Sequence, residues 1–234
     1  MFCYATLRLP RSFLLATVVL TLFGCGTTGL PDYAAPTVAV VKDAELDLSD
    51  VITYRRLRRS DFKGSKPPTH FDERMAAVTC VYTRPVIDED AVHIEPVISA
   101  DGQQAYDVTY NNLGFRALMN RNCSWWNAES QNVDEDYVLE HEQIHFALFE
   151  IAAREWSQMP ALKFQLKADD AETMKSELQT LFEQYLQQRL DVLLAQNREF
   201  DEETSLGHNP EKQAKWLKMV RSKLPFDDAL EVEQ

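Results

Sequence analysis

Apolar and polar residues alternate with a period of two in the first half of the chain. In AAVTCVYTR, residues 76–84, valine, cysteine and tyrosine alternate with threonine and valine. Such alternation of β-branched and aromatic residues is typical of strands. Similar stretches recur between Val51 and Met119, separated by the turn-like segments DEDA and ADGQQ, and Pro96 favours an edge strand. We therefore expect a small, mostly antiparallel sheet here.

The spacing of apolar residues becomes helical after Asn132. The segment 134–156 lacks proline and glycine and begins with three acidic residues, which are favourable at a helix N-terminus. A second helix is predicted from about 164 to 198, and a third from about 210 to 224, with proline at its first position. The pattern predicts an α+β fold: a sheet lobe followed by a helical lobe.

The first 24 residues have the layout of a bacterial signal peptide. Arg8 and Arg11 precede an apolar run, residues 12–23, that is short for a membrane span. The sequence LFGC, which ends at Cys25, resembles a lipobox, and the resemblance implies cleavage before Cys25 and lipidation of its sulfur. Gly26 stands where an aspartate would resemble an inner-membrane retention signal, so an outer-membrane anchor facing the periplasm is favoured. The alternative is an ordinary signal peptide that is cut nearby.

The mature chain divides into a tether, a domain and a tail. Residues 25–45 are small, interrupted by prolines and unpatterned, which is typical of a linker. Residues 46–224 are long enough to bury one hydrophobic core. Residues 225–234 form a tail.

The charge balance argues against nucleic acid as a partner. The chain carries 37 acidic and 24 basic residues, for a net charge of −13. An acidic protein repels phosphate backbones, and no polybasic segment attracts anionic lipid. The lipid anchor is therefore the expected link to the membrane.

Two of the four cysteines remain for the folded domain. Cys3 lies in the signal peptide and Cys25 at the lipidation site, which leaves Cys80 and Cys123. In an oxidising compartment two such thiols usually pair. A disulfide closing this loop would contribute roughly 3–4 kcal/mol of stability through chain entropy. The alternative is two separately buried thiols.

Two histidines stand four residues apart in the first predicted helix. Residues 141–145 read His-Glu-Gln-Ile-His, and positions i and i+4 share a helix face about 6 Å apart. Both imidazoles can reach one ion, and Glu142 lies beside that face. This is the HExxH arrangement of zinc metalloproteases, in which a third ligand completes the site and one position is left for water. The pattern predicts one zinc ion held by His141 and His145, with Glu142 as general base.

The surroundings of this motif are apolar on nearly every side. Ile144, Ala147 and Ile151 lie on other faces of the same helix, which predicts that the helix is buried. Burying two histidines and a glutamate is unfavourable unless they have partners, and a metal ion supplies one. The alternative is a pair of core histidines held by hydrogen bonds alone.

Four segments together resemble a known bacterial family. They are LEHEQIHFALFEIAAR (139–154), RSDFKG (59–64), CSWW (123–126) and FDEETSLGHNPEKQAKW (200–216). In this order they resemble the predicted secreted zinc proteases catalogued as domain of unknown function 922, over about Arg55 to Trp216. The resemblance implies a zincin-like α+β domain with a zinc-dependent peptidase activity.

The third zinc ligand has two candidates. His208 lies in the closing motif of the resemblance and is the preferred choice. Glu177 is the alternative, because a second helix running antiparallel to the first could bring it near His141. Glu150 lies about 140° around the helix from His145 and is expected to pair with Arg154 instead.

These observations favour a lipid-anchored periplasmic zinc metallopeptidase. Its partner would be a peptide or protein substrate in the cell envelope, attacked by zinc-activated water with Glu142 as base. One alternative is an envelope binding or assembly protein whose metal is structural or vestigial. Another is a cell-wall amidase.

Overall fold

The computed structural model describes residues 38–39, 50–68, 75–87, 89–129 and 134–224. The predicted signal peptide, Cys25, most of the tether and the tail lie outside the described residues.

The first sheet contains the long strand β3 at its centre. β3 (Ala77–Val86) pairs antiparallel with β6 (Gly114–Asn120), which in turn pairs with β2 (Val51–Thr53). β7 (Trp125–Trp126) also pairs with β3, and β1 (Val38–Ala39) lies parallel to β3, next to it in the order β1-β3-β6-β2. The expected antiparallel pairing is confirmed for every pair except β1 with β3.

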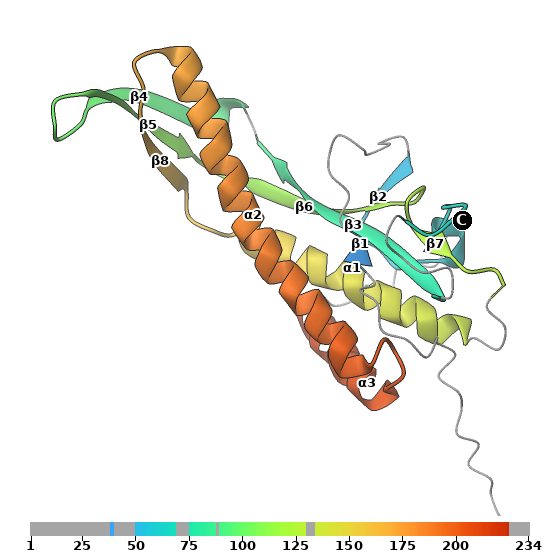
Figure 1. Cartoon of the computed structure of the whole chain (residues 1–234). Helices are drawn as coiled ribbons and strands as arrows, with labels where there is room; N and C mark the ends of the chain where they lie inside the picture. Colours follow the sequence, from blue (N-terminus) through green and yellow to red (C-terminus); the bar gives the residue numbers. More distant parts are fainter. Residues whose placement is uncertain (1–37, 40–49, 69–74, 88, 130–133, 225–234) are drawn as a thin grey trace, which may run out of the picture.

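A second sheet of three strands stands apart from the first (Figure 1). β4 (Val92–Ile98) and β8 (Leu162–Lys167) flank β5 (Gln104–Tyr110), and all pairs are antiparallel. Pro96 lies in the edge strand β4, as predicted.

β8 corrects the predicted start of the second helix. The helical pattern predicts a helix from about residue 164, but the segment LKFQLK alternates apolar and charged or polar residues with a period of two. All of its residues pair with β5, from Ala105 to Tyr110. Cross-strand pairing and burial therefore decide its structure.

Three helices follow the expected order. α1 (Glu135–Ser157) begins at its N-cap Asp134, whose carboxylate accepts from the Tyr137 amide. α2 (Ala171–Thr204) starts later and ends later than predicted. α3 (Pro210–Lys223) begins at the expected proline, after the N-cap Asn209. No helix in the described part of the chain is long and apolar enough to cross a membrane.

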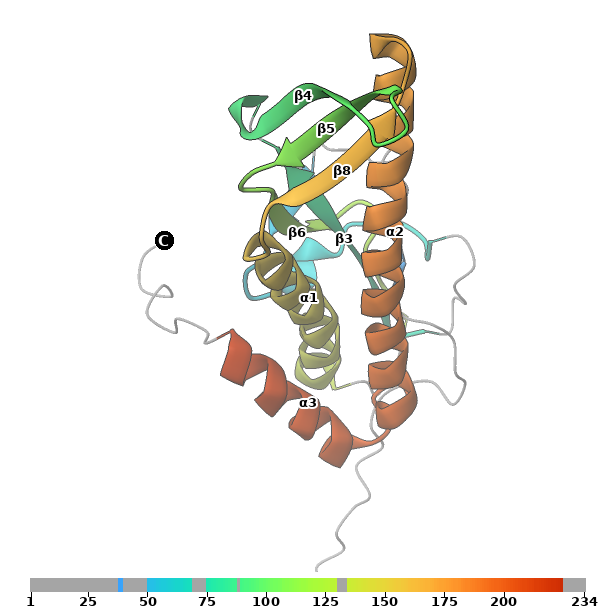
Figure 2. The ribbon, with the colours of Figure 1, turned by 90° about the vertical axis from the view of Figure 1, so that its left-hand side faces the viewer.

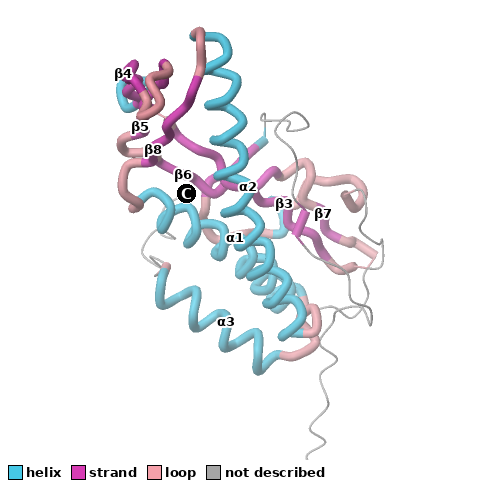
Figure 3. Tube along the Cα trace, turned by 60° about the vertical axis from the view of Figure 1, so that its left-hand side comes forward, coloured by secondary structure: helices cyan, strands magenta, loops and turns pink. Residues whose placement is uncertain are grey.

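α1 lies at the centre of the main core. α1 lies against β3 and β6 on one side and contacts α2 and α3 on the other (Figures 1 and 3). α2 runs from the second sheet past α1 to α3, so it links the second sheet to the main core (Figure 2). Phe146, Leu148 and Phe149 of α1 are fully buried in this core. The histidine motif thus lies where a sheet and two other helices meet.

The predicted disulfide is confirmed. Cys80 of β3 is bonded to Cys123 in the turn before β7, with the two Cα atoms 5.7 Å apart. The amide of Cys80 also donates to the Ser124 hydroxyl at 2.9 Å. These links fix the part of β3 that faces the histidine helix.

Candidate metal centre

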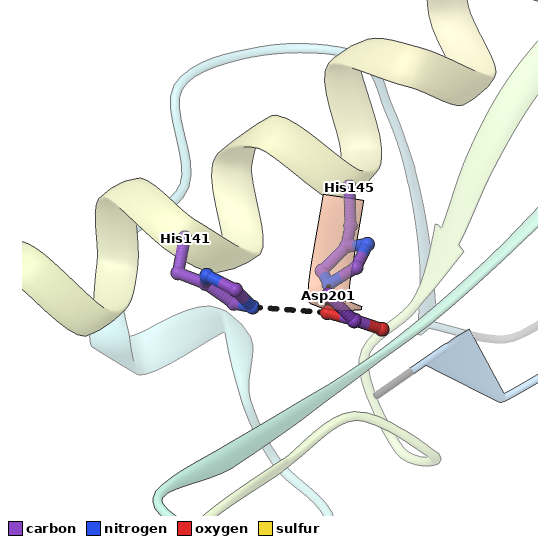
Figure 4. A group of neighbouring side chains, drawn as sticks. All are labelled: His141, His145 and Asp201. Atoms are coloured by element: carbon purple, nitrogen blue, oxygen red, sulfur yellow. Dashed lines mark hydrogen bonds and ion pairs between the residues drawn. The ribbon is translucent and has the colours of Figure 1, made fainter. Parts of the chain in front are cut away.

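Two imidazoles of α1 and one carboxylate of α2 converge on a single point (Figure 4). Asp201 Oδ1 lies 3.3 Å from His141 Nε2 and 3.1 Å from His145 Nε2. One ligand atom from each of these three residues can be chosen so that all three lie within 4.8 Å of one another. All three residues are buried.

Asp201 reaches the histidines because of how α2 ends. Its last turn packs across α1, with the Phe200 ring stacked on His141 at 4.5 Å between centroids and edge-on to His145 at 4.8 Å. α2 then stops in a tight turn in which Ser205, Leu206 and Gly207 have positive φ angles. This turn sends the chain directly into α3.

Each imidazole is held from behind by a side-chain amide. His145 Nδ1 lies 2.9 Å from Asn197 Oδ1, and His141 Nδ1 lies 3.1 Å from Gln213 Oε1. The amides cannot be reversed without losing bonds, because Asn197 Nδ2 donates to the Leu193 carbonyl and Gln213 Nε2 donates to the Tyr137 carbonyl. Both amide oxygens therefore face Nδ1, which must carry a proton in each ring.

With Nδ1 protonated, a neutral histidine presents a lone pair at Nε2. Two such lone pairs and a carboxylate oxygen then point at one another in a buried space, which is repulsive unless a cation lies between them. The positions can be filled by protons on the rings or by a metal ion. The geometry of the three residues is compatible with a bound metal ion.

The pKa values of Asp201 and His145 reflect the close approach of these polar atoms. Burial alone would raise the pKa of Asp201, but the charge of His145 and hydrogen bonds from both rings hold that pKa well below its usual range. Burial alone would lower the pKa of His145, yet the Asp201 carboxylate raises it. A carboxylate that stays ionised in the interior is a suitable metal ligand.

The donor set suits zinc. Two neutral imidazole nitrogens and one carboxylate oxygen are a known set of protein ligands for catalytic Zn²⁺, with the fourth position left to water or substrate. Within the described ranges, no fourth histidine, cysteine or carboxylate joins the group. The structure thus supplies three buried candidate ligands for one metal ion.

Glu142 lies between α1 and β3. It is 2% exposed, and its carboxylate accepts a 2.5 Å hydrogen bond from the hydroxyl of Thr79 in β3. Burial raises its pKa, while the charges of His145 and His141 act in the opposite direction. Glu142 is thus electrostatically coupled to the group without being one of its three ligands.

The structure brings His141 and His145 together, and neither of the two residues predicted as a third ligand lies beside them. Neither His208 nor Glu177 belongs to the group, and Asp201 takes that place. His208 lies in the turn after α2, where its amide donates to the Ser205 carbonyl. Glu177 lies near the start of α2, about 36 Å along the helix from Asp201.

Asp201 carried a signal in the sequence. It belongs to the FDEET segment of the resemblance, and it stands four residues after Asn197, on the same helix face. The expected pairing of Glu150 with Arg154 is confirmed at 2.8 Å, so Glu150 is turned away from the site.

Comparison with protein-family models, with curated proteins and with solved structures finds no match for this chain.

Replacing Asn197 with alanine should weaken zinc binding about 10- to 100-fold, the usual effect of removing the partner of a histidine ligand. The His145 ring loses the acceptor that fixes its tautomer and orientation. Zinc competition against a chromophoric chelator would measure the change. Asn197→Asp keeps an acceptor and should bind at least as well as Asn197→Ala. Gln187→Ala, on an exposed part of α2, is the matched control, and equal affinities for it and Asn197→Ala would contradict this role.

Proposed function

We propose that this chain is a zinc-dependent hydrolase that cleaves peptide bonds in the cell envelope. The observation that carries the proposal is the group of His141, His145 and Asp201, whose ligand atoms face one another in the interior. The amides of Asn197 and Gln213 hold both rings with Nε2 turned inward.

The chemistry follows from the position of Glu142. A divalent ion held by the three ligands would lower the pKa of a water molecule to about 7 and polarise a peptide carbonyl. Glu142 takes one proton from the attacking water on a carboxylate oxygen and passes it to the nitrogen of the leaving amine. The carbon–oxygen bond forms and the carbon–nitrogen bond breaks. The second proton of the water also passes to the leaving nitrogen, so the products are a carboxylate and an ammonium group.

The environment of Glu142 suits this role. Burial raises the pKa of the carboxyl toward neutrality, where a general base works best. The hydrogen bond from Thr79 fixes one carboxylate oxygen, so the side chain has a defined direction. The lipobox-like sequence at Cys25 and the resemblance to secreted zinc proteases support a lipid-anchored enzyme facing the periplasm.

The decisive test is metal analysis joined to hydrolysis. The purified chain should contain one zinc ion, and it should cleave unfolded casein. Complete removal of the ion with a chelator should abolish cleavage, and adding zinc should restore it. Cleavage that persists after complete metal removal would contradict the proposal. Digestion of purified peptidoglycan in place of casein would assign the chain as a cell-wall amidase.

The burial of the group favours one further candidate, a structural metal. His145 and Asp201 are 0% and 5% exposed, which is unusual for an open site. A structural site holds four protein ligands, whereas the described residues supply three. Zinc that binds tightly but leaves casein and peptidoglycan intact would favour this candidate.

A further inference from the structure

A strongly basic segment follows β2. Residues 55–66 contain six basic residues and one acidic residue, so their net charge is +5 in a chain whose net charge is −13. All six basic residues are exposed: Arg55, Arg56, Arg58, Arg59, Lys63 and Lys66. None of them belongs to the candidate metal centre. The overall charge thus hides a polybasic segment, and the expectation that no such segment is present was wrong.

The fold holds this segment in a defined conformation. Arg55 donates to both carboxylate oxygens of the buried Asp61, at 2.8 and 2.6 Å, and the Arg58 amide donates to the same carboxylate at 2.8 Å. The Leu57 amide donates to Gln143 Oε1 of α1 at 2.6 Å. A surface that is ordered in advance loses less conformational entropy on binding. The cations are therefore presented on a preorganised surface.

Nearby carboxylates cancel only part of this charge. Lys63 and Arg121 both bind Asp50, and Arg59 binds Glu135 at 2.5 Å. Within the described ranges, these two carboxylates and the buried one already described are the acidic partners shown for the segment, fewer than the cations they face. An excess of positive charge remains at the surface, where an anionic partner can bind it.

The predicted lipid anchor keeps this surface close to a bilayer. Residues 26–37 separate Cys25 from β1, which pairs with β3 of the domain. Twelve residues span at most about 40 Å when fully extended. A tether of this length gives the domain a high effective concentration at the membrane, so even a weak contact with lipid headgroups is populated.

The basic segment and the metal group lie on opposite sides of α1. Gln143, which binds the segment, stands about 200° around the helix from both His141 and His145. The two histidines instead contact Asp201 of α2, and His141 also contacts Gln213 of α3. In Figure 1, β2 and the segment after it lie on the other side of α1 from α3. A bilayer that contacts the segment would therefore leave the metal group turned away from it.

We propose that residues 55–66 form a membrane-binding surface, which holds the domain against anionic phospholipid headgroups with the metal group facing away from the bilayer. Guanidinium groups bind phosphate oxygens through paired hydrogen bonds, and each basic residue near an anionic bilayer adds to the attraction. The acidic residues elsewhere oppose it weakly, because salt screens charges beyond about 8–10 Å. The proposal rests on the proposed function only for the lipid anchor and the location in the envelope.

Vesicle binding tests the surface in the absence of the anchor. The mature chain, residues 25–234 with Cys25→Ser, carries no acyl group. It should co-sediment with vesicles of phosphatidylglycerol and phosphatidylethanolamine, and not with vesicles of phosphatidylcholine and phosphatidylethanolamine. Raising the NaCl concentration from about 50 mM to about 500 mM should release it. Equal binding to both kinds of vesicle, or binding to neither, would overturn the proposal.

Charge reversal locates the surface. Arg58→Glu with Lys66→Glu should weaken binding to the anionic vesicles at least tenfold, and Arg58→Gln with Lys66→Gln, which disturbs the segment less, should weaken it by a smaller factor. Lys175→Glu with Lys218→Glu, at exposed positions of α2 and α3, changes the net charge equally and should bind as the unmodified chain does. An equal loss in this control pair, or full binding in both variants of Arg58 and Lys66, would overturn the proposal.

A fluorescent label reports which side of the domain meets the bilayer. Cys80 and Cys123 are joined in a disulfide, so a thiol-reactive, polarity-sensitive dye would attach to a newly introduced cysteine. The dye on Ser65→Cys, within the segment, should brighten when anionic vesicles are added, whereas the dye on Lys218→Cys of α3 should not. Brightening at both positions, or at Lys218→Cys alone, would overturn the proposed orientation.

These measurements require neither zinc nor casein, so they are independent of the proposed hydrolysis. Binding to anionic vesicles by a chain that does not cleave casein would refute the peptidase and leave the membrane-binding surface in place. Zinc-dependent cleavage of casein by a chain that does not bind these vesicles would refute the membrane-binding surface alone.

Discussion

Replacing Asp201 with alanine should abolish stoichiometric zinc binding. The substitution removes one of three ligands and the only negative charge among them, and it leaves two histidine lone pairs facing an empty space. The affinity should fall by more than the roughly 100-fold that losing a ligand's hydrogen-bonding partner produces. Isothermal titration with zinc, on chain freed of metal by a chelator, measures the change.

The control variants distinguish Asp201 from the third ligands that the sequence predicted, His208 and Glu177. Asp191→Ala changes an exposed aspartate on the same helix and should bind zinc as the unmodified chain does. His208→Ala and Glu177→Ala should also keep full binding, since neither residue joins the group. Loss of zinc from His208→Ala with retention in Asp201→Ala would refute the site described above.

Replacing Glu142 with glutamine should remove hydrolysis and leave the metal in place. Glutamine keeps the size of the side chain and can still accept the hydrogen bond from Thr79, but it cannot take a proton from water. General-base catalysis contributes about 10²- to 10⁴-fold, so kcat for casein should fall within that range. Metal content, measured by mass spectrometry, should stay at one ion per chain.

A second glutamate on α1 provides the matched control. Glu155→Gln lies on the surface, where Glu155 pairs with Lys223, and it should leave kcat unchanged. Hydrolysis retained in Glu142→Gln would remove Glu142 from the mechanism. Loss of zinc from the same variant would show instead that Glu142 is needed for metal binding. The fall in kcat would then not identify Glu142 as the general base.

The resemblance and the geometry contribute different parts of the proposal. The resemblance to predicted secreted zinc proteases points to peptide hydrolysis and to zinc. The geometry supplies three candidate metal ligands and two amides that orient the rings. The metal-binding experiments therefore test the geometry, and the casein experiments test the activity.

Much of the local structure was determined by the sequence itself. The start of α1 at the N-cap Asp134, the position of α3 after Pro210, and the edge position of Pro96 follow from capping, proline geometry and periodicity. The HExxH spacing likewise places both imidazoles on one face, because helical geometry relates residues four apart. The disulfide followed from the cysteine count and from the expected oxidising compartment.

Only the tertiary structure decided which of these elements contact one another. LKFQLK forms a strand because it pairs with β5, so α2 begins later than the sequence predicted. Asp201, the third candidate ligand, lies 60 residues after His141. Its contact with the histidines depends on where α2 ends and on which face of α2 lies against α1. Periodicity shows which residues share a face, but the pairing of faces depends on packing between segments that are distant in sequence. The contact of Asp201 with both histidines, and of Asn197 and Gln213 with one ring each, was therefore decided by the packing of the helices.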